Sequence, residues 1–208
     1  MRLTSVILCI LFQIHLYSQE KGGYIIGVSI HSTDALLKQD VGISIGHFYK
    51  KNYSQLSLLY GYDIHPRILN AYSISPALSK SLGLGFTQRY YPNKNKSFFS
   101  SFFEVDLRLS RNSCENTNPN INYFLSPINV ERNILGLFFG YGISLRLPYN
   151  FRLLHTIGFG KSYIFGKNVY YFNNKFLSVG YKSLESDYSL NISMLYNLKQ
   201  SKGSKANK

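Results

Sequence analysis

The feature that most constrains the fold is an unbroken two-residue alternation in the stretch ILGLFFGYGISLRL, residues 134–147. Large apolar side chains occupy every odd position from Leu135 to Leu147, while glycine, serine and Arg146 occupy most of the even ones. Successive residues of a β-strand point to opposite faces, so the pattern predicts one long strand with a continuous apolar face. Strands of soluble proteins usually run about 5–6 residues. The length raises the question of which solvent this apolar face contacts.

Seven further segments alternate in the same way and predict seven further strands. They are residues 24–31, 41–49, 53–64, 78–91, 97–110, 151–160 and 187–198. Short polar turns and longer connections follow one another strictly along the chain. The longer connections are residues 32–40, 65–77, 111–133 and 161–186. This alternation is the plan of a bacterial outer-membrane barrel, with short periplasmic turns and long external loops. The predicted fold is therefore all-β, an eight-stranded antiparallel up-and-down transmembrane β-barrel.

The two faces of these strands predict an outer surface against lipid and a narrow, crowded interior. The predicted lipid-facing residues include Leu84, Phe103, Val105, Leu137, Phe139, Ile143 and Ile192. A soluble, secreted lipocalin-like binding barrel is the alternative, and it would turn its apolar face inward around a ligand. Glycine is a poor strand former, and its abundance on the second face is better explained by crowding inside a small barrel than by exposure to water.

Aromatic residues gather at the short-turn end of the predicted strands. They are Tyr24, Tyr49, Tyr53, Tyr90, Tyr91, Phe98, Tyr149, Phe151 and Tyr196. Amphipathic rings are enriched where a barrel wall meets the lipid headgroups. We therefore expect these residues to form a girdle on the outer surface.

The two ends of the chain predict export and a short tail. Residues 1–19 carry Arg2, an apolar run and then small and polar residues, as in a signal peptide for the Sec route, with cleavage near Gln19. The barrel domain is then expected over residues 20–198, with a basic disordered tail at 199–208. The chain has a formal net charge of +13, but its lysines gather in turns and in the tail and no nucleic-acid motif is visible. We expect this charge to face anionic lipid headgroups rather than nucleic acid.

The stretch LGLGFTQRYYPNKNKSFFSSFFEVDLRLS, residues 82–110, resembles a hairpin of the small OmpA/OmpX-type outer-membrane β-barrel proteins. In that hairpin, glycine alternation leads into Arg-Tyr-Tyr, a short polar turn and an aromatic-rich return strand. The final SMLYNL is similar to the last-strand signal read by the barrel-assembly machinery, with Tyr196 and Leu198 in the matching positions. The resemblance covers residues 24–198 and implies insertion by that machinery into a bacterial outer membrane. The basic tail departs from the pattern, and no particular activity is implied, because such barrels host enzymes, adhesins and scaffolds alike.

One set of charged residues falls on the predicted inward face. Its members are Asp63, Arg89, Glu104, Asp106, Arg108, Arg146 and Arg152. Side chains just fill the interior of an eight-stranded barrel, so opposite charges there are expected to pair and plug it. The alternative is a narrow, porin-like channel gated by the same charges.

No catalytic constellation, metal-ligand spacing or cofactor motif is visible in the chain. Outer-membrane enzymes that deacylate lipid A carry a His-x-Ser pair on a lipid-facing strand, but here Ile157 follows His155 at the serine position. Ser29 and His31 share a strand face in the reverse order. We therefore predict a non-enzymatic structural scaffold, or a surface binding or adhesion protein whose long loops contact an unidentified external partner. A lipid A-modifying enzyme remains the alternative.

Overall fold

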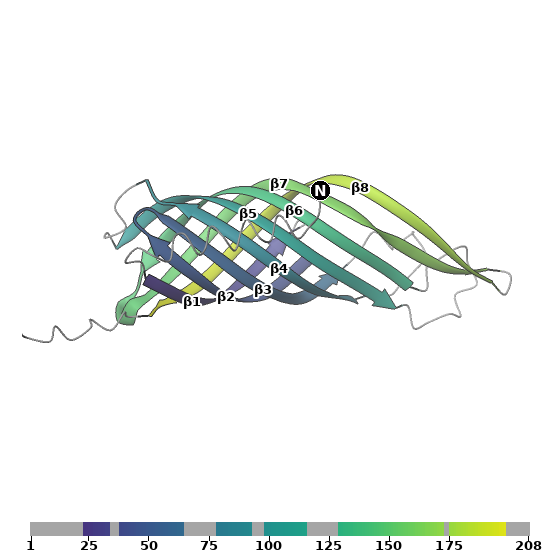
Figure 1. The fold of residues 1–208 in the computed structure, drawn as a ribbon, viewed down its shortest axis with the longest axis horizontal. Coiled ribbons are helices and arrows are strands. Elements are labelled where there is room, and N and C mark those ends of the chain that lie inside the picture. Colours follow the sequence, from purple (N-terminus) through teal and green to yellow (C-terminus); the bar gives the residue numbers. More distant parts are fainter. Residues whose placement is uncertain are drawn as a thin grey trace, which may run out of the picture.

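Eight antiparallel strands form one closed barrel in chain order (Figure 1). The computed structural model describes residues 23–33, 38–64, 78–92, 98–115, 129–172 and 175–198. The strands are β1 (Gly23–Thr33), β2 (Lys38–Tyr49), β3 (Asn52–Ile64), β4 (Leu78–Tyr90), β5 (Phe99–Glu115), β6 (Asn129–Arg146), β7 (Phe151–Phe172) and β8 (Lys175–Asn197). β1 closes the barrel by pairing with β8 from Ile25↔Asn197 to Thr33↔Ser189. The predicted eight-stranded antiparallel fold is confirmed.

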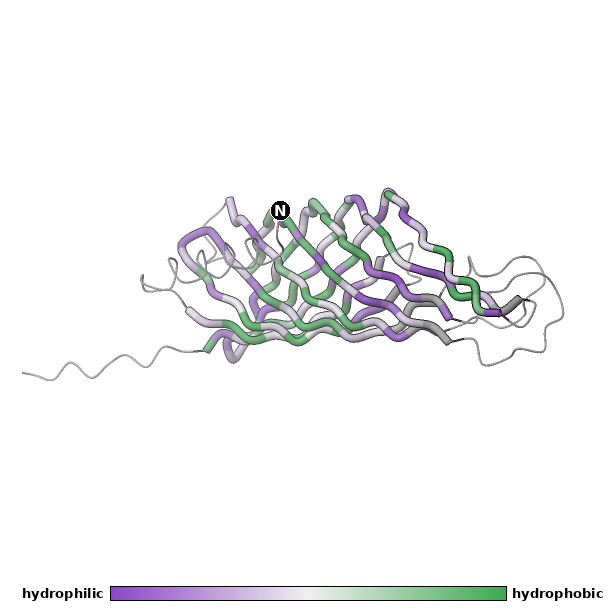
Figure 2. The backbone as a smooth tube through the Cα atoms, turned by 45° about the vertical axis from the view of Figure 1, so that its right-hand side comes forward, coloured by the Kyte–Doolittle hydropathy of each residue, from purple (hydrophilic) through white to green (hydrophobic). Residues whose placement is uncertain are grey.

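The alternation read from the sequence separates an apolar outer surface from a buried inner one. On β1, Ile26, Val28 and Ile30 are about half exposed, whereas Ser29 and His31 between and beside them are buried. Figure 2 shows hydrophobic segments, in green, recurring along the strands of the barrel wall. The predicted lipid-facing residues follow this pattern: Leu84, Phe103, Val105, Leu137, Phe139 and Ile192 are exposed, and Ile143 is partly exposed.

The short turns lie together at one end of the barrel. Lys50 and Lys51 join β2 to β3, and the 3₁₀ turn η2 (Pro148–Asn150) joins β6 to β7. Lys50 adopts a left-handed conformation with φ of 52°, which suits a tight turn between antiparallel strands. None of the helices in the described part of the chain is long and apolar enough to cross a membrane.

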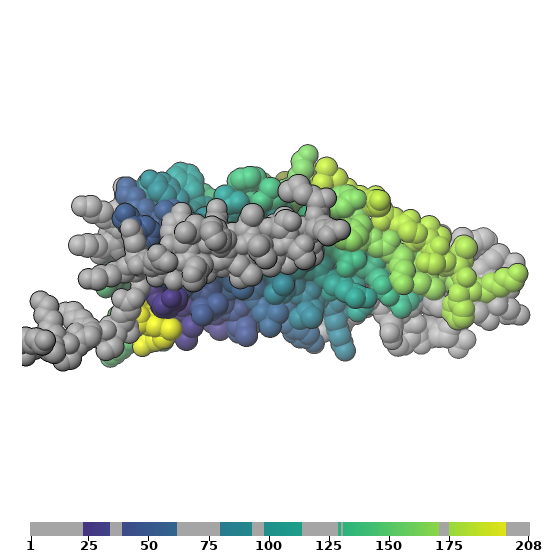
Figure 3. Space-filling model, viewed as in Figure 1, coloured from purple at the N-terminus to yellow at the C-terminus, as the bar shows by residue number. Residues whose placement is uncertain are grey.

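The strands lengthen along the chain, and this is where the sequence prediction of the loops is wrong. β1 to β4 have 11 to 13 residues, whereas β5, β6, β7 and β8 have 17, 18, 22 and 23. Residues 161–172 and 175–186, which belong to an expected loop at 161–186, are strand residues and form the outer part of a β7–β8 hairpin that protrudes at the long-loop end (Figures 1 and 3). Beyond the barrel both faces of a strand are exposed, so the apolar and polar alternation that predicts a strand fades.

Several predictions fall on residues outside the described part of the chain. The predicted signal peptide, residues 1–19, and the predicted basic tail, residues 199–208, both lie there. The same holds for the predicted loop at residues 65–77 and for the centre of the one at 111–133.

Candidate functional site

A buried ion pair joins β4 and β5 inside the barrel. The Nε of Arg89 donates to Oε2 of Glu104 at 2.6 Å, and Nη1 of Arg89 donates to Oε1 of Gln55 on β3 at 2.7 Å. From β7, the hydroxyl of Thr156 donates to Glu104 at 3.4 Å. Arg89 is fully buried and Glu104 is 5% exposed. Four strands therefore converge on one Arg–Glu pair.

A second ion pair lies farther along the inner face of β5. The Nε of Arg108 donates to Oδ2 of Asp106 at 2.6 Å, and Thr87 on β4 donates to the other carboxylate oxygen at 3.0 Å. The Nη2 of Arg108 crosses the interior and donates to the hydroxyl of Ser189 on β8 at 2.7 Å. The two pairs place Glu104, Asp106 and Arg108 side by side, as strand alternation requires.

Among the described residues, Arg146 and Arg152 were also expected in the interior but do not join these pairs. Arg152 is half-buried near the short-turn end, with its guanidinium 5.5 Å from the ring of Phe48. Arg146 is exposed, so its predicted interior position is wrong. It is the last residue of β6 and is paired directly with Arg152, and two cations at that spacing favour placing one of them in water. The side chain of Asp63 lies outside the described residues.

A buried hydrophobic cluster that was not predicted from the sequence lies inside the barrel at the short-turn end. Its members are Ile25, Tyr53, Tyr91, Phe102, Leu154 and Leu195. The rings of Tyr91 and Phe102 are 5.2 Å apart, and the guanidinium of Arg89 lies 5.2 Å from the ring of Tyr53. A Cβ at Gly142 would overlap the ring of Phe102, so glycine at this position makes room for the cluster.

Tyr53 and Tyr91 therefore correct the predicted aromatic girdle. Both were expected on the outer surface, but they are 1% and 2% exposed inside the barrel. Tyr91 is two residues from Arg89, and Tyr53 is two residues from Gln55, so each shares the inward face with a buried polar residue. Because side chains two residues apart in a strand share a face, the buried positions of Arg89 and Gln55 indicate that Tyr91 and Tyr53 point into the barrel. Aromatic character alone does not indicate this.

A further group of buried polar residues lies near the C-terminal end of β1. The hydroxyl of Ser29 and Nε2 of His31 are 2.7 Å apart, and both residues are buried. Asp40 on β2, also buried, is paired directly with His31. The alternation within β1 predicts that Ser29 and His31 share a face, but only the strand register brings the carboxylate of Asp40 next to them. Their position inside the barrel wall makes these residues part of its packing.

His155 lies on the outer surface and has no serine at the matching position. Its direct neighbours in the sheet are Ile143 on β6 and Ile192 on β8. Ile157, at the place where lipid A deacylases have their serine, is exposed on the same face. Among the described residues, no group of three or more histidine, cysteine, aspartate or glutamate side chains is arranged to hold a metal ion.

The protruding β7–β8 hairpin exposes large apolar side chains beyond the barrel. β1 pairs with β8 only over residues 189–197, so among the described strands residues 175–188 of β8 pair with β7 alone. Phe176, Leu177 and Leu184 on this segment are 72%, 53% and 63% exposed. The hairpin therefore presents apolar side chains and a strand edge beyond the barrel.

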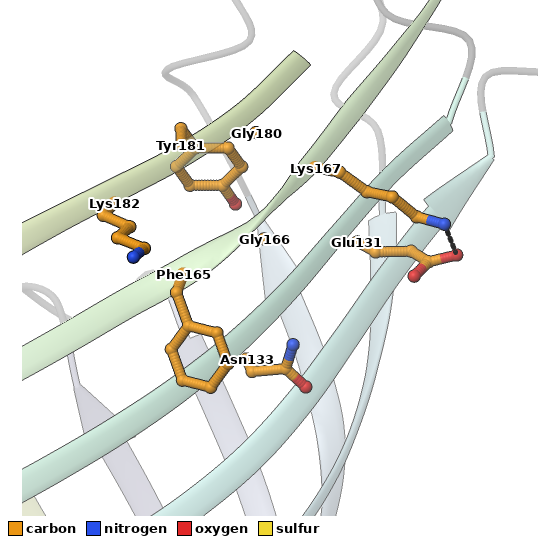
Figure 4. Close-up of a pocket in the computed structure, with 8 residues that line it drawn as sticks. All are labelled: Glu131, Asn133, Phe165, Gly166, Lys167, Gly180, Tyr181 and Lys182. Atoms are coloured by element: carbon orange, nitrogen blue, oxygen red, sulfur yellow. Dashed lines mark ion pairs between the residues drawn. The ribbon is translucent and has the colours of Figure 1, made fainter. Parts of the chain in front are cut away.

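An open groove lies on the outer face at the base of this hairpin (Figure 4). It has a volume of about 700 Å³. Its lining residues come from β6, β7 and β8 and are Glu131, Asn133, Phe165, Gly166, Lys167, Gly180, Tyr181 and Lys182.

Comparison with known proteins relates this chain to others through its fold. No protein-family model matches it, and no curated protein is detectably similar in sequence. Among solved structures, a major outer membrane protein from Thermus thermophilus is similar over 86% of this chain and all of that one, with a TM-score of 0.56 and 9% identity. This chain has the fold of an outer-membrane β-barrel.

Two further barrels are similar at lower scores. The similarity to the N-terminal β-barrel domain of Pseudomonas aeruginosa OprF extends over 85% of this chain and 97% of that one, at 13% identity and a TM-score of 0.47. The similarity to Neisserial surface protein A extends over 86% of this chain and 98% of that one, at 13% identity and a TM-score of 0.49. The predicted OmpA/OmpX-type architecture is confirmed, since this chain has the fold of an outer-membrane barrel, with eight up-and-down strands closed in chain order.

Proposed function

We propose that the protein is a non-enzymatic β-barrel of the bacterial outer membrane that contacts an external partner through its protruding hairpin and long loops. The membrane placement is supported by the outer surface, where large apolar residues are exposed on every strand. Soluble monomers rarely expose contiguous apolar patches larger than a few hundred Å². The interior also supports the membrane placement. A lipocalin-like barrel would hold an apolar ligand there, whereas this interior contains the buried residues Arg89, Glu104, Asp106 and Arg108.

The β7–β8 hairpin is the observation that carries the binding role. A strand tilted in an outer-membrane barrel needs about 9–11 residues to cross the bilayer, and β7 and β8 have 22 and 23. Their outer halves therefore extend beyond the hydrocarbon core of the bilayer, yet Phe176, Leu177 and Leu184 remain exposed there. Strand edges with apolar side chains are templates for adding an extended segment of another polypeptide. We propose such a segment as the partner.

Trimming the hairpin tests this role. Tyr163 and Leu184 are directly paired, so replacing residues 164–183 with an Asn-Gly turn restores a tight hairpin and leaves the barrel intact. We expect cells that carry the trimmed protein to adhere several-fold less to protein-coated surfaces and to one another than cells with the full chain. The amount of folded barrel in the outer membrane, measured by its heat-dependent gel mobility, should be the same.

Unchanged adherence of the trimmed strain would contradict the binding role. The enzymatic alternative has its own readout, the acyl pattern of lipid A with and without the gene. We expect the same pattern in both. A difference that disappears with His155→Ala would replace the binding proposal with a lipid-modifying activity.

A further inference from the structure

Strand register arranges the outward side chains above the barrel belt in two adjacent rows. Arg111, Asn133, Phe165 and Lys182 are successive partners across β5 to β8. Ser113, Glu131, Lys167 and Gly180 form the next row outward. Since Gly180 has no side chain, the surface is hollowed beside Lys182, and this hollow is the groove of Figure 4.

The groove carries an excess of positive charge. Lys182 and Lys167 line it, and Arg111 adjoins it. Glu131 is the one carboxylate among the lining residues, and its oxygens lie 3.5 Å from both Arg111 and Lys167. Arg111 and Lys167 together carry one positive charge more than is needed to neutralise Glu131. Lys182 adds a further exposed ammonium group. Such a site attracts anions, phosphate above all.

The height of the groove places it just outside the apolar belt. Between Phe151 and Lys161 of β7, ten residues at about 3.3 Å each and a tilt of about 40° span roughly 25 Å along the barrel axis, the height of a lipid-facing belt. Phe159 and Ile157 are exposed on the belt side of Lys161. Phe165 and Lys167 lie farther out, by roughly 10–15 Å on the same reckoning. The layer at that height contains lipid headgroups.

We infer that this groove binds the phosphorylated saccharide headgroup of an outer-leaflet glycolipid. The inference rests on the outer-membrane placement proposed above. Lys167 and Lys182 would contact phosphate, the amide of Asn133 can exchange hydrogen bonds with sugar hydroxyls, and the ring of Phe165 offers an apolar face to a pyranose. The acyl chains of the same lipid would pack on the belt below. A volume of about 700 Å³ suits such a group, because small-molecule sites usually measure about 300–1,000 Å³.

Gly180 provides a way to block the groove without changing its charge. Among the described residues, a Cβ at Gly180 would have only the carbonyl oxygen of Gly166 nearby, at 3.8 Å, which is an ordinary contact. Gly180→Val is therefore compatible with the strand and fills the hollow. Gly166 is unsuitable, because a Cβ there would collide with the carbonyl of Glu131.

The test titrates the purified, folded barrel in detergent micelles with bisphosphorylated lipid A and follows binding by native mass spectrometry. We expect bisphosphorylated lipid A to bind at least 10-fold more tightly than the chemically dephosphorylated lipid. Gly180→Val should weaken binding at least 10-fold, and the double variant Lys167→Gln/Lys182→Gln should remove most of the preference for phosphate. A matched double variant with the same charge change at the opposite end, Lys50→Gln/Lys51→Gln, should bind as the unmodified protein does.

Three results would overturn the inference. The first is equal binding of lipid A and its dephosphorylated form. The second is an equal loss of lipid binding in the Lys50→Gln/Lys51→Gln control, which would indicate attraction by net charge alone, and the third is full displacement of lipid A by inorganic phosphate at the same concentration. Every variant is first checked for heat-dependent gel mobility. A folded, inserted barrel without phosphate preference contradicts this inference alone, whereas a chain that never inserts contradicts the membrane placement itself.

Discussion

Replacing Glu104 with alanine is expected to lower the free energy of unfolding of the refolded barrel by about 3–5 kcal/mol. The substitution removes the carboxylate that accepts from Nε of Arg89 at 2.6 Å. Arg89 is fully buried, so its charge would keep only the amide oxygen of Gln55 as a hydrogen-bond acceptor among its described contacts. The measurement is the urea midpoint of the barrel in lipid vesicles, with unfolding followed by gel mobility.

Two controls separate the ion pair from other effects of the Glu104 substitution. Glu104→Gln retains the size and one acceptor oxygen, and should lose less stability than alanine. Lys80→Ala changes an exposed cation and should alter the free energy by no more than about 0.5 kcal/mol. A neutral Glu104→Ala variant that conducts ions in planar bilayers would contradict the plug and favour the gated channel.

Replacing Phe102 with alanine is expected to cost a further large share of the stability, about 3–5 kcal/mol. Phe102 is fully buried, packs on Tyr91 and covers Gly142, so its removal leaves a cavity in the buried cluster at the short-turn end. The neighbouring residue is a matched control, because Phe103 has the same side chain on the opposite face and is 56% exposed. We expect Phe103→Ala to cost clearly less in the same urea titration.

Equal losses from Phe102→Ala and Phe103→Ala would mean that the barrel is not stabilised by its interior cluster. A larger loss from Phe103→Ala would mean that the two faces have been assigned the wrong way round. The pair therefore tests the orientation of β5 as well as the strength of its packing.

Strand alternation alone predicts most of the barrel wall. In residues 134–147 the two-residue period assigns a face to every side chain, because the exposed outer surface and the filled interior are sharply different environments there. The same rule places Glu104, Asp106 and Arg108 on one buried face. It fails in residues 161–186, where the inner face is only partly buried beyond Ser162 and neither Lys167 nor Gly180 is obliged to alternate with an apolar neighbour.

Contacts between strands are harder to predict than faces. Asp40 stands opposite His31 only because of the register between β1 and β2, and no spacing within one strand reveals it. Arg146 shares the inward phase of Arg152, but its place at the end of β6 lets it turn to water. The strand phase of Tyr53 and Tyr91 points inward, and it decides their face even though aromatic residues are typical of an outer girdle.

The heat dependence of electrophoretic mobility, combined with membrane fractionation, tests the central claim most directly. A closed barrel that keeps its hydrogen bonds within its own wall resists detergent until it is boiled. We predict that the protein is recovered in the outer-membrane fraction and that unheated and boiled samples migrate differently. Recovery in a soluble periplasmic or secreted fraction, with the same mobility before and after boiling, would contradict the membrane barrel.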